Sequence, residues 1–439
     1  MINNYQKSED HDVIIVGSGP GGLGVAATLE GWHPYLSDTL NFKFGPNIDN
    51  IIRRSQSDLL QFKPSELLYH NVRPIDFFRR YHHPENYSLN PDQYKIKFSK
   101  IKSLDWLMIT SGKPGGLWNE VPRNQLTLGP SYWMELAHYP MKQFFVDFDL
   151  DRDPNELGHR DDIILYYEKF VERFNLHHKI RGGEKLVHVD QGDNERRFKL
   201  IVDTNSSQKV YECDYLVFAV GPKSQPRKLQ WQDENNSFIS NNYTYPGDYP
   251  GDSCVIVGGG RSSDWAATEL YDAEKLVVYV MRQAKENHLR LIKDSLHLPY
   301  YQRLNVIMNS QSNRFKIMYD SEIKRFTDDG NVTVIDNKSQ ITSEIITDHL
   351  IVEIGASANY QLLSKWFPLT LISKRDNYRF QLMQMVCNQS TFESVDIPGL
   401  YPAGYLAEGT GLSVIGFHAG SYLIAGDIYR KINKFSNGE

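Results

Sequence analysis

Cysteine is scarce in this sequence. Its 439 residues include only three cysteines, Cys213, Cys254 and Cys387, which lie far apart and form no C-x-x-C pair. This spacing excludes a disulfide framework and an adjacent pair of redox-active thiols. Because scattered free cysteines are typical of a reducing compartment, we expect a cytoplasmic protein.

Long apolar runs are missing too. A membrane-spanning helix needs about 20 consecutive apolar residues, and the nearest approach, residues 412–426, is interrupted by His418 and by three glycines. We interpret this stretch as a packed helix, in which His418 is either a core residue or a proton carrier. The polar residues 1–13 lack the apolar region of a secretory signal.

The sequence has no excess of positive charge. Its formal net charge is −6 at pH 7, whereas nucleic-acid binding requires a basic surface. No Ser-His-Asp set or cluster of metal ligands is visible, so any catalysis would depend on a cofactor. The length predicts two or three domains, and 40% hydrophobic with 23% charged residues is typical of a globular protein.

What the sequence does have is three glycine-rich segments. They are "GSGPGG" at 17–22, called the first loop; "PGGLW" at 114–118, called the PGGLW segment; and "GGGRSS" at 258–263, called the second loop. Apolar runs of strand length alternate with amphipathic stretches along the chain, which predicts an α/β architecture.

The first loop has the spacing of a dinucleotide-binding turn. It follows the apolar run 12–16 and precedes helix-forming residues, and Gly17, Gly19 and Gly22 fit G-x-G-x-x-G. Such a turn lets the backbone approach a pyrophosphate at the N-terminus of a helix. The predicted cofactor-binding residues of this loop are Gly17, Gly19, Pro20, Gly21 and Gly22.

The acid that usually binds the ribose is ambiguous. Asp38 lies at about the expected distance after the loop. The strand predicted to lead into the PGGLW segment, however, ends in Ile109, Thr110 and Ser111. If the irregular residues 39–104 are an insertion between the first helix and the second strand, the acid is missing and Asp38 is a surface residue.

Local patterns predict several other elements. Helices are expected at 57–62, 73–83 and 161–175, the last with Asp161 and Asp162 where acids suit the helix dipole. Strands are expected at 185–190, 197–203, 211–222, 276–283 and 348–355.

The second loop repeats the strand–glycine–helix pattern. Gly258 and Gly260 match the first two glycines, but Ser263 replaces the third. Arg282 ends the following strand, where a basic residue accommodates a 2′-phosphate and an acid would select NADH. Because guanidinium groups suit phosphates, we expect NADPH here, contacted by Gly258, Gly260, Arg261, Ser262, Ser263 and Arg282.

The order of the short motifs resembles the oxidative stress-induced growth inhibitor family, which is related to flavin-containing monooxygenases. The resemblance covers most of the chain through the first loop, the PGGLW segment, "SYWMEL" (131–136), "LVFAVGP" (216–222), "VIVGGGRSSDWA" (255–266), "LIVEIG" (350–355) and "GLYPAGYLA" (399–407). It implies a two-dinucleotide-binding flavoprotein: an FAD-binding Rossmann-like domain with an inserted NAD(P)H-binding Rossmann-like domain.

The resemblance also assigns residues and boundaries. FAD would be contacted by Gly115, Gly116, Leu117 and Trp118, and by Gly404 and Tyr405 in the last flavin segment, where many relatives carry an acid in place of Tyr405. The implied domains are 1–245 for FAD, with an insertion at about 39–104; 246–345 for NADPH; and 346–439 for FAD again.

The resemblance implies an FAD- and NADPH-dependent monooxygenase. It would use O2 to oxygenate a small-molecule substrate through a hydroperoxyflavin. The F-x-G-x-x-x-H fingerprint of flavin monooxygenases is not legible before residue 254. Two alternatives therefore stay open: an NADPH-oxidising flavoenzyme that oxygenates no substrate, and a growth-regulatory or interaction protein that retains the fold with little turnover. The sequence predicts neither the substrate nor the oligomeric state.

Overall fold

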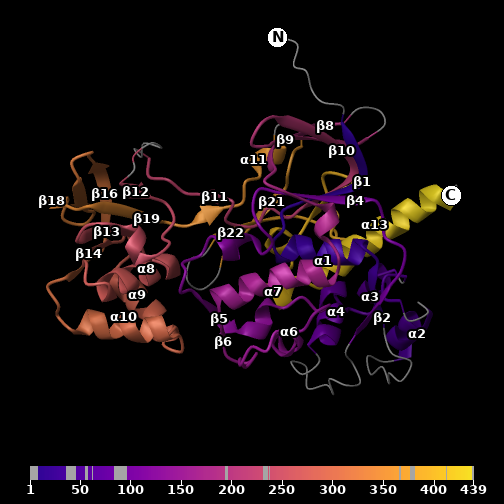
Figure 1. The fold of residues 1–439 in the computed structure, drawn as a ribbon, viewed down its shortest axis with the longest axis horizontal. Helices are drawn as coiled ribbons and strands as arrows, with labels where there is room; N and C mark the ends of the chain where they lie inside the picture. Colours follow the sequence, from indigo (N-terminus) through magenta and orange to yellow (C-terminus); the bar gives the residue numbers. More distant parts are fainter. Residues whose placement is uncertain are drawn as a thin grey trace, which may run out of the picture.

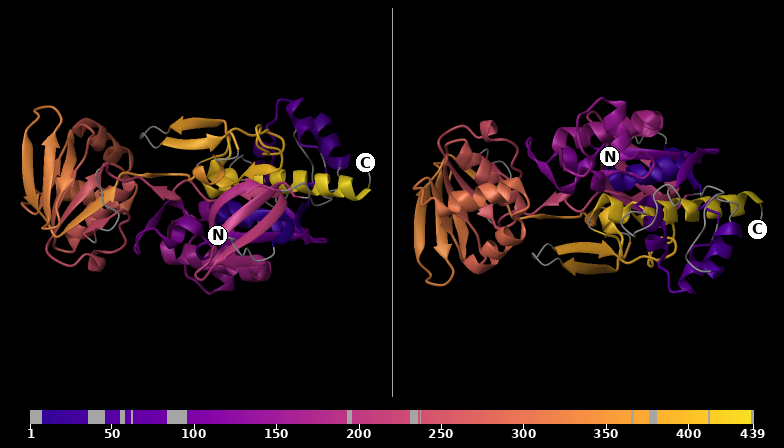
Figure 2. Two further views of the ribbon diagram at one scale, coloured as in Figure 1. Left: turned by 90° about the horizontal axis from the view of Figure 1, so that it is seen from above. Right: turned by 90° about the horizontal axis from the view of Figure 1, so that it is seen from below.

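The structure is a computed structural model. It describes residues 8–35, 46–54, 58–61, 63–83, 96–192, 196–230, 236, 238–364, 367–375, 381–411 and 413–437. Figures 1 and 2 show two lobes, joined by a pair of extended strands. Among the described helices, none combines the length and the apolar character needed to cross a membrane.

The first lobe is built on a seven-stranded sheet with strand order β7-β4-β1-β10-β9-β8, with β23 also paired to β10. Its strands are β1 (Glu9–Val16), β4 (Trp106–Thr110), β7 (Ile180–Gly182), β8 (Lys185–Gln191), β9 (Phe198–Asp203), β10 (Gln208–Phe218) and β23 (Leu400–Pro402). The strands beside β1 run parallel to it, and Val16 is level with Ile109 and Phe218.

Both faces of this sheet are covered, which explains the continuous apolar run of β1. Val13 and Ile15 pack into one core and Ile14 and Val16 into another. Helices α1 (Pro20–Leu29) and α13 (Gly420–Asn437) pack together on one side (Figure 1). Outside the insertion, the other described helices of this lobe are α6 (Met141–Asp147), α7 (Arg160–Arg173), α11 (Gln361–Ser364) and the one-turn α12 (Val414–Phe417).

The insertion lies between α1 and β4. It contains β2 (Trp32–Tyr35), β3 (Lys97–Lys100), α2 (Pro46–Arg54), α3 (Ser65–Leu68) and α4 (Pro74–His82). The helix predicted at 73–83 is confirmed. The helix predicted at 57–62 is wrong for the described residues 58–61, which form a turn, because the Asp58 carboxylate accepts the Leu60 N–H at 2.9 Å and contacts His33.

The second lobe has a five-stranded parallel sheet with strand order β12-β19-β13-β14-β15. These strands are β12 (Ile239–Ser240), β13 (Ser253–Gly258), β14 (Leu276–Val280), β15 (Phe315–Met318) and β19 (His349–Glu353). Helices α8 (Arg261–Asp272), α9 (Lys285–Asp294) and α10 (Pro299–Asn309) accompany it. An antiparallel sheet is formed by β16 (Ser321–Phe326), β17 (Asn331–Asp336) and β18 (Thr342–Ile346).

Two short strands cross between the lobes. They are β11 (Gln225–Pro226) and β20 (Ala356–Ser357), which pair antiparallel (Figure 1). The predicted boundary at 345 falls just before β19, a strand of the second sheet, and the division into domains stays a prediction. The remaining elements are β5 (Leu126–Pro130), β6 (Leu157–His159), β21 (Leu371–Arg375), β22 (Gln381–Met385) and the 3-10 turns η2 (Gly116–Asn119), η3 (Ser131–Met134), η4 (His177–Lys179), η5 (Pro246–Asp248) and η6 (Gly404–Leu406).

Candidate functional site

Two glycines of the first loop are required by the chain itself. Gly17 has φ +106°, and a Cβ atom there would lie 2.4 Å from the Ala219 oxygen. A Cβ atom at Gly22 would lie 2.1 Å from the Gly17 oxygen. These residues therefore allow the tight turn and the close packing of α1 on β1, as the G-x-G-x-x-G spacing predicts.

Gly19 differs, because no contact with the residues that the structure describes requires it to be glycine. Its φ of −73° and ψ of 175° suit any residue, and a Cβ atom would meet only the Gly116 Cα, at an ordinary 3.8 Å. It directly precedes α1, whose first N–H groups have no intrahelical acceptor. The missing side chain thus leaves a cradle at a helix N-terminus, which fits a pyrophosphate.

Three segments distant in sequence meet at this loop. A Cβ atom at Gly116 would lie 2.9 Å from the Gly19 Cα, and one at Gly21 would lie 3.0 Å from the Gly404 Cα. The Gly115 N–H donates to the Ser18 oxygen at 2.9 Å. The structure therefore brings together the first loop, the PGGLW segment and the last flavin segment, all of which were predicted to contact FAD.

The PGGLW segment forms a single 3-10 turn, with no regular helix after it. Gly115 and Gly116 both have positive φ, and the Asn119 side-chain amide donates to three carbonyl groups of the turn. Leu117 is 38% exposed, whereas Trp118 is partly buried against the core of the first lobe. Trp118 lies two residues after Gly116, which touches the first loop, and its contact with a flavin stays a prediction.

The second parallel strand carries no acid. β4 lies beside β1 and ends at Thr110, so the insertion does separate the first helix from the second strand. The Thr110 hydroxyl lies 2.8 Å from the Ser18 hydroxyl. Asp38 lies outside the described residues. Thr110 and the exposed Ser111 occupy the place where a ribose-binding acid would stand.

The last flavin segment ends in an interrupted helix. Gly404 has φ +64° and begins the turn η6, and burial raises the pKa of Tyr405 to about 12, so its hydroxyl stays protonated. The Tyr405 ring contacts Phe417, with ring centroids 4.8 Å apart. The single helix expected from residue 411 onward is two helices, since α12 ends at Phe417 and α13 begins at Gly420.

The insertion holds this segment by two arginines that sequence reasoning missed. On α4, Arg79 donates to the Gly416 oxygen at 2.7 Å, and Arg73, just before the helix, donates to the Gly409 oxygen at 2.7 Å. The partners are more than 330 residues apart in sequence, so no local signal could have paired them.

The second loop repeats the first in one respect. Gly260 has φ −126°, and a Cβ atom there would meet nothing within 4 Å, so this glycine is also not required by the chain. Gly258 is required, because its Cβ atom would lie 2.6 Å from the Glu353 oxygen. The second loop therefore has a cradle before α8, as the first loop has before α1.

Ser263 compensates for the missing third glycine. Its hydroxyl accepts the N–H groups of Gly259 and Gly260 at 2.9 and 3.0 Å and donates to the Gly260 oxygen at 2.8 Å. The residue is fully buried. The serine thus holds the turn by hydrogen bonds to Gly259 and Gly260. The backbone N–H groups of Arg261 and Ser262 follow at the first turn of α8.

Arg261 and Arg282, the two arginines predicted to contact NADPH, lie in different surroundings. The Arg261 guanidinium lies 5.5 Å from the centroid of the Tyr301 ring. Arg282 is exposed just after β14, and its neighbour Gln283 donates to the Gly259 oxygen at 2.8 Å. Gln283 thus ties the strand end carrying Arg282 to the loop, and sequence reasoning missed this residue.

A buried polar network lies beneath the second loop. Asp264 is fully buried, and its carboxylate accepts the hydroxyls of Tyr279 at 2.7 Å and Tyr301 at 2.9 Å. His288 Nε2 is 2.8 Å from the same carboxylate. Burial raises the pKa of Tyr279 and of Tyr301, so both remain donors. The network fixes α8 and the ring beneath Arg261.

Two residues of opposite charge, Lys223 and Glu353, follow or end strands that border the two loops. Lys223 follows β10, whose continuation at Ala219 touches Gly17, and Glu353 ends β19 opposite Gly258. Burial lowers the pKa of Lys223 and raises that of Glu353, and each charge partly offsets the shift of the other. Neither residue belongs to a recognisable motif.

Three histidines are buried in the first lobe, and one of them packs against α1. His82, His138 and His418 are 3%, 8% and 1% exposed, and a Cβ atom at Gly24 would meet the His418 ring at 2.6 Å. His418 is therefore a core residue. Burial lowers the pKa of all three, to about 3 for His138.

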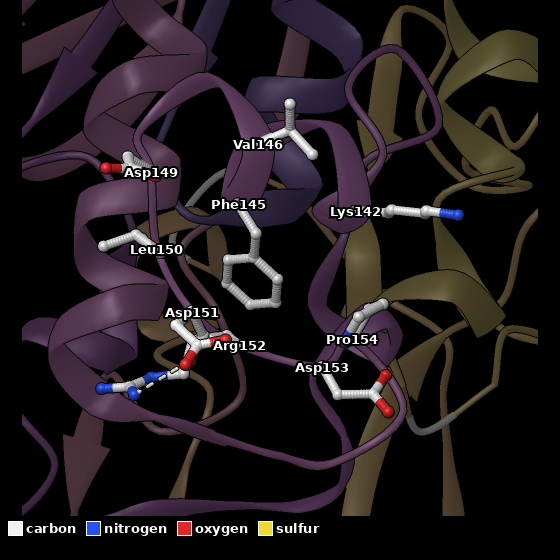
Figure 3. Close-up of a pocket in the computed structure, with 9 residues that line it drawn as sticks. All are labelled: Lys142, Phe145, Val146, Asp149, Leu150, Asp151, Arg152, Asp153 and Pro154. Carbon is white, nitrogen blue, oxygen red and sulfur yellow. Dashed lines mark hydrogen bonds between the residues drawn. The ribbon is translucent and has the colours of Figure 1, made fainter.

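A hollow on the first lobe lies away from the glycine loops. It has a volume of about 700 Å³ and is lined by the end of α6 and the loop 149–154 (Figure 3). None of its lining residues belongs to a glycine segment. Among the described residues, no three His, Cys, Asp or Glu side chains are spaced for a metal ion. Cys213, Cys254 and Cys387 are free and buried.

Residues 94–404 match the pyridine nucleotide-disulphide oxidoreductase family. The chain belongs to this family. It is therefore a member of a flavoprotein oxidoreductase family, and the predicted two-dinucleotide-binding α/β fold is confirmed.

Curated relatives confirm the resemblance seen in the sequence. The chain is 26% identical over 262 residues to an oxidative stress induced growth inhibitor homolog of Caenorhabditis elegans, which covers 54% of this chain and 52% of that protein. It is 22% identical over 351 residues to the human oxidative stress-induced growth inhibitor 2, covering 68% of each. The chain thus spans about half the length of the first relative.

Solved structures share the fold at low sequence identity. The bacillithiol disulfide reductase of Staphylococcus aureus has a TM-score of 0.64 at 17% identity and covers 96% of this chain and 99% of its own. A flavin-containing monooxygenase from Stenotrophomonas maltophilia has a TM-score of 0.56 at 13% identity, with 97% and 99% covered. The same fold therefore serves reductases and monooxygenases.

Proposed function

We propose that this protein is an FAD- and NADPH-dependent monooxygenase that uses O2 on a small-molecule substrate. The observation that carries the proposal is the pair of cradles at Gly19 and Gly260. Each lies at the N-terminus of a helix that follows a parallel strand, and no contact with a described residue explains its missing side chain. Two bound dinucleotides explain both.

FAD is assigned to the first loop because three segments enclose it. Gly116 and Gly404 approach Gly19 and Gly21, and the partly buried Trp118 and Tyr405 lie on the same two segments. NADPH is assigned to the second loop, where Arg261 and Arg282 supply guanidinium groups for a 2′-phosphate. When bound, the flavin would accept hydride and activate oxygen.

The cysteines favour oxygen chemistry over the reduction of a disulfide by a thiol pair of this chain. Burial raises the pKa of the Cys254 and Cys387 thiols to about 12 and raises that of Cys213 as well. Thiols held protonated in this way are poor nucleophiles. The three cysteines are unpaired, so the chain supplies no dithiol to exchange electrons with a flavin.

The first experiment asks whether both cofactors bind and react. Purified protein should be yellow with about one FAD per chain, and anaerobic NADPH should bleach the flavin faster than NADH does. A colourless protein that neither binds added FAD nor oxidises NADPH would contradict the proposal. That result would favour the growth-regulatory alternative, which the names of the curated relatives suggest.

The second experiment separates a monooxygenase from an enzyme that only oxidises NADPH. Peroxide release and NADPH consumption would be measured together, with and without a panel of soft nucleophiles such as sulfides and amines. A monooxygenase should release less peroxide per NADPH when a substrate is present. Peroxide that equals NADPH under every condition would support the oxidase alternative.

A further inference from the structure

The segment between residues 113 and 126, called the strut, begins against the first loop. The Ser18 hydroxyl donates to the Lys113 oxygen at 3.1 Å, and Gly116 touches Gly19. Asn119 then fastens the turn, and the Asn119 oxygen accepts the Arg160 side chain of α7 at 3.2 Å. One end of the strut is therefore fixed to the first lobe at the cradle itself.

The other end of the strut contacts the second lobe. The Asn124 amide donates to Glu269 Oε1 at 2.9 Å, and the Arg123 N–H donates to the Thr244 oxygen at 3.0 Å. The other carboxylate oxygen of Glu269 accepts the Tyr243 hydroxyl at 2.9 Å. Leu126 and Leu157 also pack against the core of the second lobe.

Glu269 lies on the helix that starts at the second loop. α8 runs from Arg261 to Asp272, so Glu269 is about 12 Å along its axis from Arg261, the first residue after the cradle at Gly260. The contacts thus form a continuous path from Gly19 through Gly116, Asn124 and Glu269 to the start of α8. This path joins the two cradles without passing through the crossing strands.

The crossing strands alone make a weak connection. β11 and β20 are each two residues long and pair through Gln225 with Ser357 and Pro226 with Ala356. Such a narrow ribbon is a hinge, because few contacts resist a rotation of one lobe against the other. Contacts away from this hinge, such as those of the strut, are needed to fix the angle between the lobes.

We propose that Asn124 and Glu269 are positioning residues that hold the two nucleotide sites at the distance required for hydride transfer. The proposal rests on the proposed function for its consequence, because hydride passes only when the reacting atoms are about 3–3.5 Å apart. Its structural content, the fixed angle between the lobes, does not depend on any bound cofactor.

The test places two like charges at the contact. In Asn124→Asp, a carboxylate faces the Glu269 carboxylate and pushes the lobes apart. The double variant Asn124→Asp/Glu269→Gln restores a donor and an acceptor and should reverse the effect. Asn236→Asp is the matched control, because Asn236 donates in the same way to Asp328 at 3.0 Å but entirely within the second lobe.

The first readout is the distance between the lobes. Spin labels on the exposed positions Ser206→Cys and Ser339→Cys report it by pulsed electron paramagnetic resonance, since the native cysteines are buried. Asn124→Asp should broaden or lengthen the distance distribution, and the double variant and Asn236→Asp should match the parent. An unchanged distribution in folded Asn124→Asp would overturn the proposal, whatever the protein's activity.

The second readout is the rate of flavin reduction by NADPH in a single turnover. A misplacement of about 1 Å can cost about 100-fold, so Asn124→Asp should slow reduction by about 10- to 100-fold with unchanged FAD content. The double variant should recover the parent rate. If the parent protein is not reduced by NADPH, the proposed function fails, while the distance measurement still decides the positioning role.

Discussion

The Cα atom of Gly19 lies 2.9 Å from where a Cβ atom of Gly116 would be placed. The two glycines belong to segments almost 100 residues apart, and Gly116 also has φ +55°. Gly116 is therefore required by the protein chain, whereas no contact with a described residue requires glycine at position 19. This difference predicts distinct consequences for substitutions at the two positions.

Gly19→Val should leave the fold intact and prevent FAD binding. The Cβ atom of the valine would make only an ordinary van der Waals contact with Gly116. The rest of its side chain would project into the cradle where the pyrophosphate would approach. We expect FAD affinity to fall at least tenfold, or about 1.4 kcal/mol, by fluorescence titration. Gly112→Ala is the control, because its Cβ atom would meet nothing within 4 Å. Stoichiometric FAD in folded Gly19→Val would remove the first loop from the site.

Arg282→Ala should reduce the preference for NADPH over NADH. A hydrogen bond to a charged group contributes about 1.5–3 kcal/mol, so the ratio of the two kcat/KM values should fall roughly 10- to 150-fold. The change should come from NADPH, because NADH lacks the 2′-phosphate. Arg282→Lys keeps the charge and should retain part of the preference. An unchanged ratio in Arg282→Ala would leave the 2′-phosphate to Arg261.

Trp118→Ala should retain FAD but change its surroundings. Trp118 is partly buried on the segment that touches the first loop, and the glycines that hold this segment remain in the variant. We expect a shifted flavin absorbance spectrum and a larger share of NADPH lost to peroxide. Trp118→Phe should restore much of the parent behaviour. A solved complex with Trp118 more than about 10 Å from the flavin would exclude any packing contact.

Mild acid should destabilise the fold through the buried histidines. Burial lowers the folded-state pKa of His82, His138 and His418, so below the unfolded value of about 6.5 the unfolded chain binds more protons. Stability is then full above that pH and falls as pH drops toward the folded pKa values. The free energy of unfolding should fall by about 1.4 kcal/mol per pH unit for each histidine.

Urea unfolding between pH 7.5 and 5 measures this slope. His82→Phe removes one titrating group, and within the described residues neither ring nitrogen of His82 has a hydrogen-bond partner. The slope of the unfolding free energy against pH should therefore be smaller in this variant, by the equivalent of about one bound proton. A free energy of unfolding that does not change over this range would show that the histidines are accessible to water or protonated in the folded protein.

The local patterns of the sequence were sufficient for most of the regular structure. The apolar runs predicted β1, β13 and β19, and the acids at 161 and 162 correctly marked the start of α7. Turn chemistry was less visible: the Asp58 carboxylate binds its own backbone and prevents a helix. The break between α12 and α13 was also missed, although it falls where His418 and Gly420 interrupt the apolar stretch.

The site depended on contacts that a single sequence does not reveal. The glycine spacing identified both loops, but not that Gly116 and Gly404 pack on the first loop. Ser263 looked like a departure from the pattern, and only the positions of the Gly259 and Gly260 N–H groups show that its hydroxyl supports the turn. Arg79 and Asn124 act on distant segments, so neither could be separated from ordinary surface residues.

The nesting of the second lobe has a consequence for how the chain matures during translation. The strands of the second lobe, β12 to β19, follow one another in the chain, so this lobe can fold while the ribosome is still adding residues. The first sheet cannot be completed until β23 pairs with β10, and Gly21 has no Gly404 to pack on before then. A nascent chain would thus complete its second lobe before its first sheet closes, and the first loop would gain its packing on Gly404 only afterwards.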